Sequence, residues 1–221
     1  MTAGGGFIIA IDGPAASGKG TIAEGLGDAF SLPVLDSGLL YRAVGVTLAR
    51  DGGDTHDAGA AEAVARALDT ARLNDPAFRT REAGEAASVV AAHPGVRRAL
   101  RDFQQAFAAQ DGGAVIDGRD IGTVIAPQAP AKLFVTATPE VRADRRFRQL
   151  RTHGQDVAFE DVLADIRRRD ERDTGRADSP LVRAEDAALL DTTTMSISQA
   201  ADAARRIVEA ARARWESSRQ G

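Results

Sequence analysis

The sequence predicts an α/β fold in which helices cover both faces of a parallel β-sheet. Short, fully apolar runs alternate along the chain with longer segments of helical periodicity, as in parallel sheets whose strands are buried on both faces. A glycine-rich stretch, residues 13–21, separates the first apolar run from the first helical segment. Because ligands of such sheets bind at the carboxyl ends of the strands, the polar residues directly after the strands are the first candidates for a functional site; these are Asp12 and the loop after it, Asp36, residues 117–120 and Asp191.

Five strands and the helices between them follow from this pattern. The strands are expected at residues 7–11, 33–35, 114–116, 133–135 and 188–190. Helices are expected at residues 21–30, 39–50, 58–71 and 82–92, from 94 to the DGG at 111–113, from 138 onward, around 159–166 and from 196 to about 215, with an irregular segment at 72–79. Pro94 and Pro139 suit first helical turns, and Ser196 with Gln199 has the spacing of a capping box.

Composition narrows the class of protein. The 221 residues carry a net charge of −4 and no cysteine, which excludes disulfides and zinc–thiolate sites and provides no broad basic surface for nucleic acid or membranes. No apolar stretch approaches the roughly 20 residues of a membrane span, and the N-terminal segment lacks the basic start and long apolar region of a signal peptide. We therefore expect one domain, residues 1–221, that is cytoplasmic and monomeric, with no nucleic-acid or membrane partner.

The glycine-rich stretch has the context of a phosphate-binding loop, since it joins a strand to a helix with G-x-x-x-x-G-K spacing. Its residues are Gly13, Pro14, Ala15, Ala16, Ser17, Gly18, Lys19, Gly20 and Thr21. Small residues let backbone N–H groups surround phosphate oxygens, and Lys19 is one of only two lysines in an arginine-rich chain. The alternative is an ordinary strand-to-helix turn. Thr21 stands one place later than the usual hydroxyl, and no guanine-reading Asn/Thr-Lys-x-Asp segment follows Lys132, which argues against a regulatory GTPase.

Two further groups of polar residues follow strands. After the second strand come Asp36, Ser37 and Arg42; Ser37 is a candidate helix cap, and Arg42 is either a phosphate contact or a surface residue. After the third strand come Asp117, Arg119 and Asp120. Asp117 ends an apolar strand and could orient magnesium through water, whereas Arg119 and Asp120 could also form a structural ion pair.

A third charged group, RRRDERDTGR at residues 167–176, contains Arg169, Arg172, Asp173 and Arg176. Such a run is usually a solvated helix face. Beside a phosphate-binding loop it also suits a lid that brings guanidinium groups to a migrating phosphoryl group, with Arg145 and Arg146 of the preceding helix as further candidates.

Together the motifs GPAASGKGT, LDSGLLYR, DGRDIGTV, RDERDTGR and SPLVRAEDA…LLDTT closely resemble the bacterial-type cytidylate kinases, a branch of the nucleoside monophosphate kinases. The resemblance spans roughly residues 7–194. It implies a P-loop core with a monophosphate-binding insertion at about 57–112 and a mobile lid at about 151–183. Two departures stand out: Ala16 replaces a common glycine, and only RLNDPAF stands where a small antiparallel sheet is expected, so that the insertion is trimmed.

The resemblance also implies an activity, transfer of a phosphoryl group from ATP to CMP or dCMP with Mg²⁺, and a role for each matching residue. Arg42 and Arg119 would hold the acceptor phosphate, with Asp36 and Ser37 beside them. Cytosine would be read by Ser88, Arg97 and Asp120. The ribose would be held by Arg169 and Asp173. Lys19, Arg119, Arg169 and Arg176 would act in catalysis, and Thr21 and Asp117 would bind the metal, partly through water. The alternatives are a same-fold kinase for UMP or a small metabolite, and a non-catalytic nucleotide-binding module.

Overall fold

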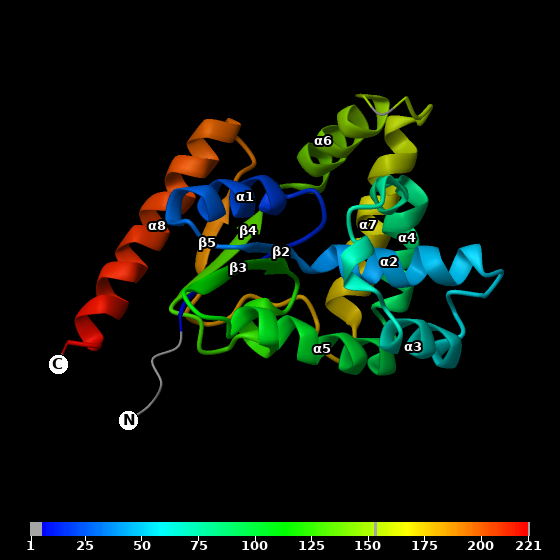
Figure 1. The fold of residues 1–221 in the computed structure, drawn as a ribbon. Coiled ribbons are helices and arrows are strands. Elements are labelled where there is room, and N and C mark those ends of the chain that lie inside the picture. Colours follow the sequence, from blue (N-terminus) through cyan, green and yellow to red (C-terminus); the bar gives the residue numbers. More distant parts are fainter. Residues whose placement is uncertain (1–5, 153, 221) are drawn as a thin grey trace.

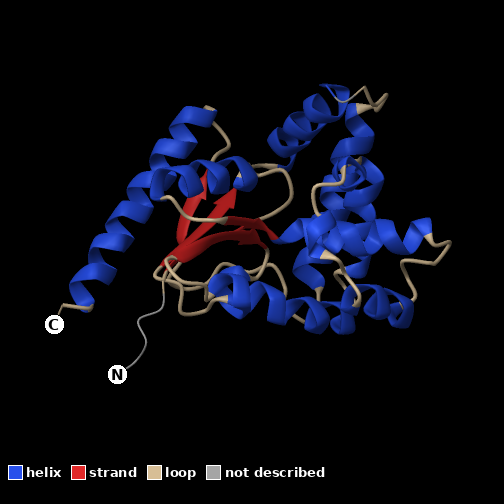
Figure 2. Ribbon diagram, viewed as in Figure 1, coloured by secondary structure: helices blue, strands red, loops and turns tan. Residues whose placement is uncertain are grey.

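The computed structural model describes residues 6–152 and 154–220. Its centre is one parallel sheet of five strands in the order β2-β3-β1-β4-β5, flanked by helices (Figures 1 and 2). The strands are β1 (Phe7–Asp12), β2 (Val34–Asp36), β3 (Gly113–Gly118), β4 (Ala131–Thr136) and β5 (Ala188–Asp191). All five predicted strands are therefore present, and the α/β fold class is confirmed.

Both faces of the sheet are buried. On one face, Ile9 and Ile11 of β1 pack with α1 (Lys19–Phe30) and α8 (Ile197–Ser218). On the other, Ala10 packs against α5 (Pro94–Ala108) and against a single π-helical turn at Ile121–Ile125, which we call the π-turn. Burial on both faces explains why the strands are apolar throughout.

A second lobe lies beyond the carboxyl ends of the strands (Figure 1). It contains α2 (Ser37–Arg50), α3 (Ala58–Arg66), α4 (Arg81–Val90) and the start of α5, which share a core around Leu40, Val44 and Val96. Residues 57–112, whose backbone is described throughout, form helices and short 3₁₀ turns and no strand.

Two further helices, α6 (Pro139–Thr152) and α7 (Phe159–Gly175), pack against each other around Ala143, Leu150 and Ile166. Their small core also includes Ala15 of the glycine-rich loop, so the pair rests directly on that loop. No helix in the described part of the chain is both long enough and apolar enough to cross a membrane.

Several predicted boundaries were wrong. The helix expected at 58–71 ends at Arg66, because the Asp69 carboxylate accepts a hydrogen bond from the backbone N–H of Ala71 and starts a separate 3₁₀ turn, Thr70–Arg72. The segment 72–79, expected to be irregular, contains a second 3₁₀ turn at Pro76–Arg79. The capping box of Ser196 and Gln199 at the start of α8 is present as predicted.

Candidate active site

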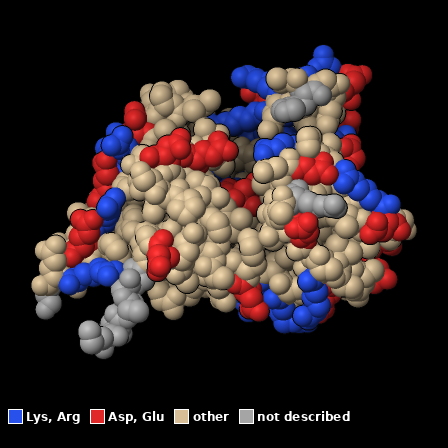
Figure 3. Space-filling view, in the orientation of Figure 1, with Lys and Arg blue, Asp and Glu red and all other residues tan. Residues whose placement is uncertain are grey.

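A cavity of about 430 Å³ lies at the carboxyl ends of the strands, between the sheet, the second lobe and the pair of helices α6 and α7. Figure 3 shows the hollow in this face, with basic and acidic side chains both at its walls. The following candidates from the sequence line it: Ala15, Ala16, Gly18, Lys19, Gly20, Thr21, Asp36, Ser37, Arg42, Ser88, Arg97, Asp117, Arg119, Asp120, Arg169, Asp173 and Arg176. Gly13, Pro14 and Ser17 belong to the loop but not to the cavity wall. Residues from four of the motifs, together with Ser88 and Arg97, therefore meet in one place.

The glycine-rich loop has a backbone that its small residues make possible. Gly13 has a φ of +148°, and a Cβ there would lie 1.9 Å from the carbonyl oxygen of Val135. Gly18, directly before α1, has a φ of +97°. Ala16, which stands where the family that the motifs resemble often has glycine, has a φ of +59°. An alanine in this left-handed conformation costs roughly 1–2 kcal/mol, so the loop carries local strain at Ala16.

Lys19 lies at the first turn of α1 and is almost wholly buried. Its Nζ donates a hydrogen bond to the carbonyl oxygen of Pro14, 2.9 Å away, which holds the side chain across the loop. Burial, aided by repulsion from the Arg119 guanidinium, lowers the pKa of Lys19 to about 7. A polyanion bound in the loop would restore the full charge of this ammonium group.

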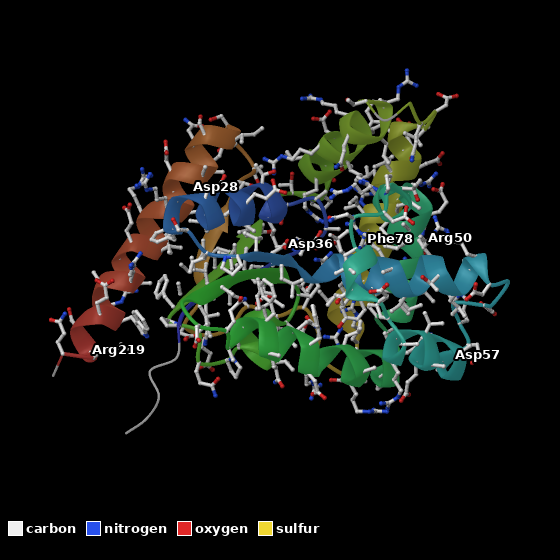
Figure 4. The ribbon with its side chains drawn as sticks, in the orientation of Figure 1. Asp28, Asp36, Arg50, Asp57, Phe78 and Arg219 are labelled. Carbon is white, nitrogen blue, oxygen red and sulfur yellow. The ribbon has the colours of Figure 1, made fainter. Side chains whose placement is uncertain are left out.

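Asp36 and Ser37 lie where β2 passes into α2, next to the end of β3. The expectation that Ser37 caps this helix was wrong. The cap of α2 is Asp36, whose Oδ1 accepts a hydrogen bond from the Gly38 N–H at 2.9 Å; Figure 4 labels it where β2 passes into α2. Ser37 is instead the first helical residue, and its hydroxyl donates to the backbone carbonyl of Asp117 at 2.8 Å. This bond joins the start of α2 to the end of β3.

Asp117 is a buried carboxyl group whose Oδ1 has no hydrogen-bond partner in the part of the chain that the structure describes. Burial, together with repulsion from Asp36, raises the pKa of Asp117 to about 7. An oxygen of this kind is suited to a cation or to a water molecule bound by one. The described residues contain no cluster of three or more metal-ligating side chains, so protein atoms alone would not enclose a metal here.

Arginines from several elements form the remaining walls. Asp173, on α7, is buried and accepts a hydrogen bond from Arg119 Nε at 2.7 Å and another from Arg176. Burial alone would raise the pKa of Asp173, but these two guanidinium groups outweigh it and lower the pKa. Burial and repulsion from Arg119 lower the pKa of Arg169 to about 9. Arg42 reaches the same cavity from α2.

A deeper wall combines Ser88 of α4 with Arg97 of α5 and Asp120. Arg97 and Asp120 form a buried ion pair, and the Arg97 guanidinium lies over the Tyr41 ring, 5.6 Å from its centre. The sequence analysis considered a pair between the neighbours Arg119 and Asp120; the structure pairs each with a residue distant in sequence instead.

Unsatisfied polar atoms concentrate in this cavity. Among the described residues, eight buried side-chain polar atoms have no hydrogen-bond partner, and six of them belong to residues that line it. The six are Nε of Arg42, Arg97, Arg169 and Arg176, Oγ of Ser88 and Oδ1 of Asp117. Each costs about 1–3 kcal/mol if left unpaired. Four arginines with such atoms in the walls of one cavity indicate a ligand that carries anionic groups.

Three other arginines were candidates for the lid: Arg145, Arg146 and Arg172. Of these three, only Arg146 lines the cavity. Arg146 lines the cavity and donates to the carbonyl of Thr80 at 3.1 Å. Arg145 does not line it; its guanidinium bonds to Thr192 and to the carbonyl of Ser17, and so supports the loop from outside. Arg172 pairs with Glu85 on α4 at 2.7 Å.

Two further residues belong to the site or support it, and sequence reasoning missed the first of them. Tyr41 lines the cavity and stacks on Arg97; it is the only tyrosine of the chain and lies inside a quoted motif, which could have singled it out. Asp12 ends β1 directly before the loop, and its carboxylate accepts hydrogen bonds from two backbone N–H groups of the π-turn. Its position at the end of a buried strand placed it among the polar residues expected at this edge of the sheet, but its role could not be predicted because its partners are more than 100 residues away.

Comparison with known proteins identifies the family. The family model described as cytidylate kinase matches residues 9–210. The chain belongs to the cytidylate kinase family. A cytidylate kinase of Caulobacter vibrioides is 66% identical over 209 residues, which cover 95% of this chain and 98% of the relative. A cytidylate kinase of Xanthobacter autotrophicus is 64% identical over 207 residues, with coverage of 94% and 99%.

Solved structures bear on the fold alone. An uncharacterised protein from Eubacterium ventriosum matches with a TM-score of 0.53 at 14% identity, over 92% of this chain and 98% of that chain. An unliganded sugar kinase from Janibacter matches with a TM-score of 0.50 at 14% identity, over 92% and 95%. Membership of the family makes the chain an ATP-dependent kinase that acts on nucleotides, as its motifs indicated.

Proposed function

We propose that this chain transfers the γ-phosphoryl group of ATP to CMP, and to dCMP, giving ADP and CDP or dCDP. The observation that carries the proposal is the cavity itself. A phosphate-binding loop forms one wall, and arginines with unpaired N–H groups form the others. The cavity therefore combines a phosphate-binding loop with opposing basic side chains, the arrangement in which two phosphorylated molecules meet end to end for phosphoryl transfer.

On the donor side, the loop would bind the phosphates of ATP through backbone N–H groups, with Lys19 on the terminal phosphates. Mg²⁺ fits this wall, because Asp117 has an unpaired buried oxygen and Thr21 lines the same cavity. Thr21 would ligate the ion directly and Asp117 through water, with phosphate oxygens and further waters as the other ligands. The ion would supply neutralising charge to the phosphates.

On the acceptor side, Arg42 and Arg119 would hold the phosphate of CMP near the loop. The ribose would lie against Arg169 and Asp173, which are on the same helix, α7. Because deoxyribose lacks only the 2′-hydroxyl group, dCMP would occupy the same wall with one polar contact fewer.

Ser88, Arg97 and Asp120 would read the base. Cytosine has an amino donor where uracil has a carbonyl acceptor, so a carboxylate at Asp120 pairs with the first and repels the second. The buried ion pair with Arg97 holds this carboxylate in one orientation. Selection by a buried polar group of this kind is effective because the wrong base leaves it unpaired.

The transfer step needs charge stabilisation more than a base, since the acceptor phosphate is already an anion. Lys19, Arg119, Arg169 and Arg176 would neutralise the migrating group in an environment of low dielectric constant. Residues 151–183 would act as a lid over the reacting atoms, and residues 57–112 would enclose the acceptor. Closure of the lid would keep water from competing with CMP.

The test is to follow a mixture of ATP, Mg²⁺ and CMP by ³¹P NMR. We expect the signals of ADP and CDP to appear together in equal amounts, and only a slow release of inorganic phosphate when CMP is omitted. Formation of inorganic phosphate instead of CDP, at the same rate with and without CMP, would mean that water is the acceptor and would overturn the proposal. No turnover at all would leave only a nucleotide-binding module.

A further inference from the structure

Asp12, which does not line the cavity, accepts hydrogen bonds from the segment that directly follows Arg119 and Asp120. Asp12 stands at the last position of β1, next to Gly118 of β3 in the sheet register. Its Oδ1 accepts a hydrogen bond from the Ile121 N–H at 2.8 Å, and its Oδ2 accepts one from the Gly122 N–H at 2.7 Å. The side chain is buried, so water does not compete for these bonds.

These two bonds satisfy N–H groups at the start of the π-turn, which have no partner within the turn itself. The carbonyl of Asp120 accepts bonds from Val124 and Ile125, so Asp120 is the residue at which the turn begins. Without the Asp12 carboxylate, two buried N–H groups would be unpaired, and the start of the turn would be free to shift. Any shift there moves Arg119 and Asp120 directly.

We propose that Asp12 is a positioning residue for the acceptor site: it fixes the segment that presents Arg119 and Asp120 to CMP. This inference rests on the proposed function, in which those two residues bind CMP. Asp12 itself touches no substrate in this account. Its loss would therefore lower the population of molecules whose acceptor site is formed, and the apparent affinity for CMP would fall by that fraction.

The decisive variant is Asp12→Asn. At this position each carboxylate oxygen serves a different N–H group, so an amide keeps one bond and turns an NH₂ group toward the other N–H. The matched control is Asp57→Asn. Asp57 also accepts two backbone N–H groups, those of Gly59 and Ala60, but through Oδ1 alone, so an amide can keep both. Asp57 is exposed and lies away from the cavity at the start of α3 (Figure 4).

Isothermal titration of each protein with CMP alone and with ATP alone gives a readout that does not depend on turnover. For Asp12→Asn we expect CMP binding to weaken by about 5- to 150-fold, the range that corresponds to one buried N–H group losing its partner. ATP binding should change by less than about threefold, and Asp57→Asn should match the wild type for both nucleotides. Equal weakening of CMP and ATP would indicate a general loss of structure and would overturn the proposal, as would unchanged CMP binding.

A second variant keeps the test decisive if Asp12→Asn does not fold. Gly122→Ala alters the same contact from the other side, because a Cβ there would lie 3.3 Å from Asp12 Oδ2. It should weaken CMP selectively, by less than Asp12→Asn does; unchanged CMP binding in a folded Gly122→Ala protein would refute the positioning role. Failure of the wild type to bind CMP would instead refute the proposed function, so the two failures are distinguishable.

Discussion

Replacing Lys19 by methionine separates the catalytic role of its charge from its place in the fold. Methionine keeps most of the length and apolar volume of the side chain but removes the ammonium group. Lys19 is buried, and among the described residues its Nζ bonds only to a carbonyl of its own loop, so the loss costs the fold one local hydrogen bond, worth roughly 1 kcal/mol. The loop backbone, set by Gly13 and Gly18, should keep its shape.

The expected effect on turnover is much larger. A charge aimed at a developing negative charge in a buried site is commonly worth about 3–4 kcal/mol, or roughly 100- to 1000-fold in kcat. A coupled assay of ADP release at saturating CMP measures it. The control is Lys132→Met, the only other lysine, whose Nζ pairs with Asp186 at 2.8 Å, and it should retain normal turnover. Turnover of the Lys19→Met protein within tenfold of the wild type would refute the phosphate-binding role.

The pH dependence of stability gives an independent check on the burial of this charge. The pKa of Lys19 is about 7 in the folded protein against 10.5 ordinarily. Between these values the unfolded chain binds more protons, so the free energy of unfolding that Lys19 contributes rises as the pH rises from 7. Denaturant unfolding at pH 7 and pH 9 should therefore show the wild type gaining stability relative to Lys19→Met. An equal response of the two proteins would mean that this ammonium group is not desolvated.

Three further predictions follow from the cavity walls. Asp120→Asn should narrow the preference for CMP over UMP, mainly by weakening CMP, because an amide can donate as well as accept; an unchanged ratio of kcat/KM values would remove Asp120 from base reading. Hydrogen exchange across residues 167–176 should slow when ATP and CMP bind together, and equal protection with and without ligands would count against a lid. Asp173→Asn leaves the guanidinium groups of Arg119 and Arg176 without their shared carboxylate, so denaturant unfolding should show a loss of about 3–5 kcal/mol; a loss below about 1 kcal/mol would mean that the pair is solvated.

The sequence predicted those parts of the molecule that depend on local patterns. The strands and the glycine-rich loop were found because burial on both faces and the demand for small residues act on neighbouring positions. The ends of the helices were less predictable, since Asp36 and Ser37 can both act as caps and only the packed structure determines which of them does.

The site was predictable as a set of residues but not as a set of contacts. The motifs supplied Arg97, Asp120, Arg119 and Asp173, and all four line the cavity. Their pairing joins residues 23 and 54 positions apart in the chain, so no local pattern could indicate it. The bonds from Asp12 to the π-turn are more distant still, and the turn itself has no sequence signal that we recognised.

The central claim, that this cavity phosphorylates CMP, is tested most directly by comparing kcat/KM for CMP, dCMP, UMP, AMP, GMP and shikimate with ATP as the donor. We expect CMP and dCMP to be the best acceptors, with CMP ahead of UMP by roughly 5- to 150-fold, the effect of leaving one buried polar group unpaired. A higher kcat/KM for UMP, for a purine nucleotide or for shikimate than for CMP would contradict the account.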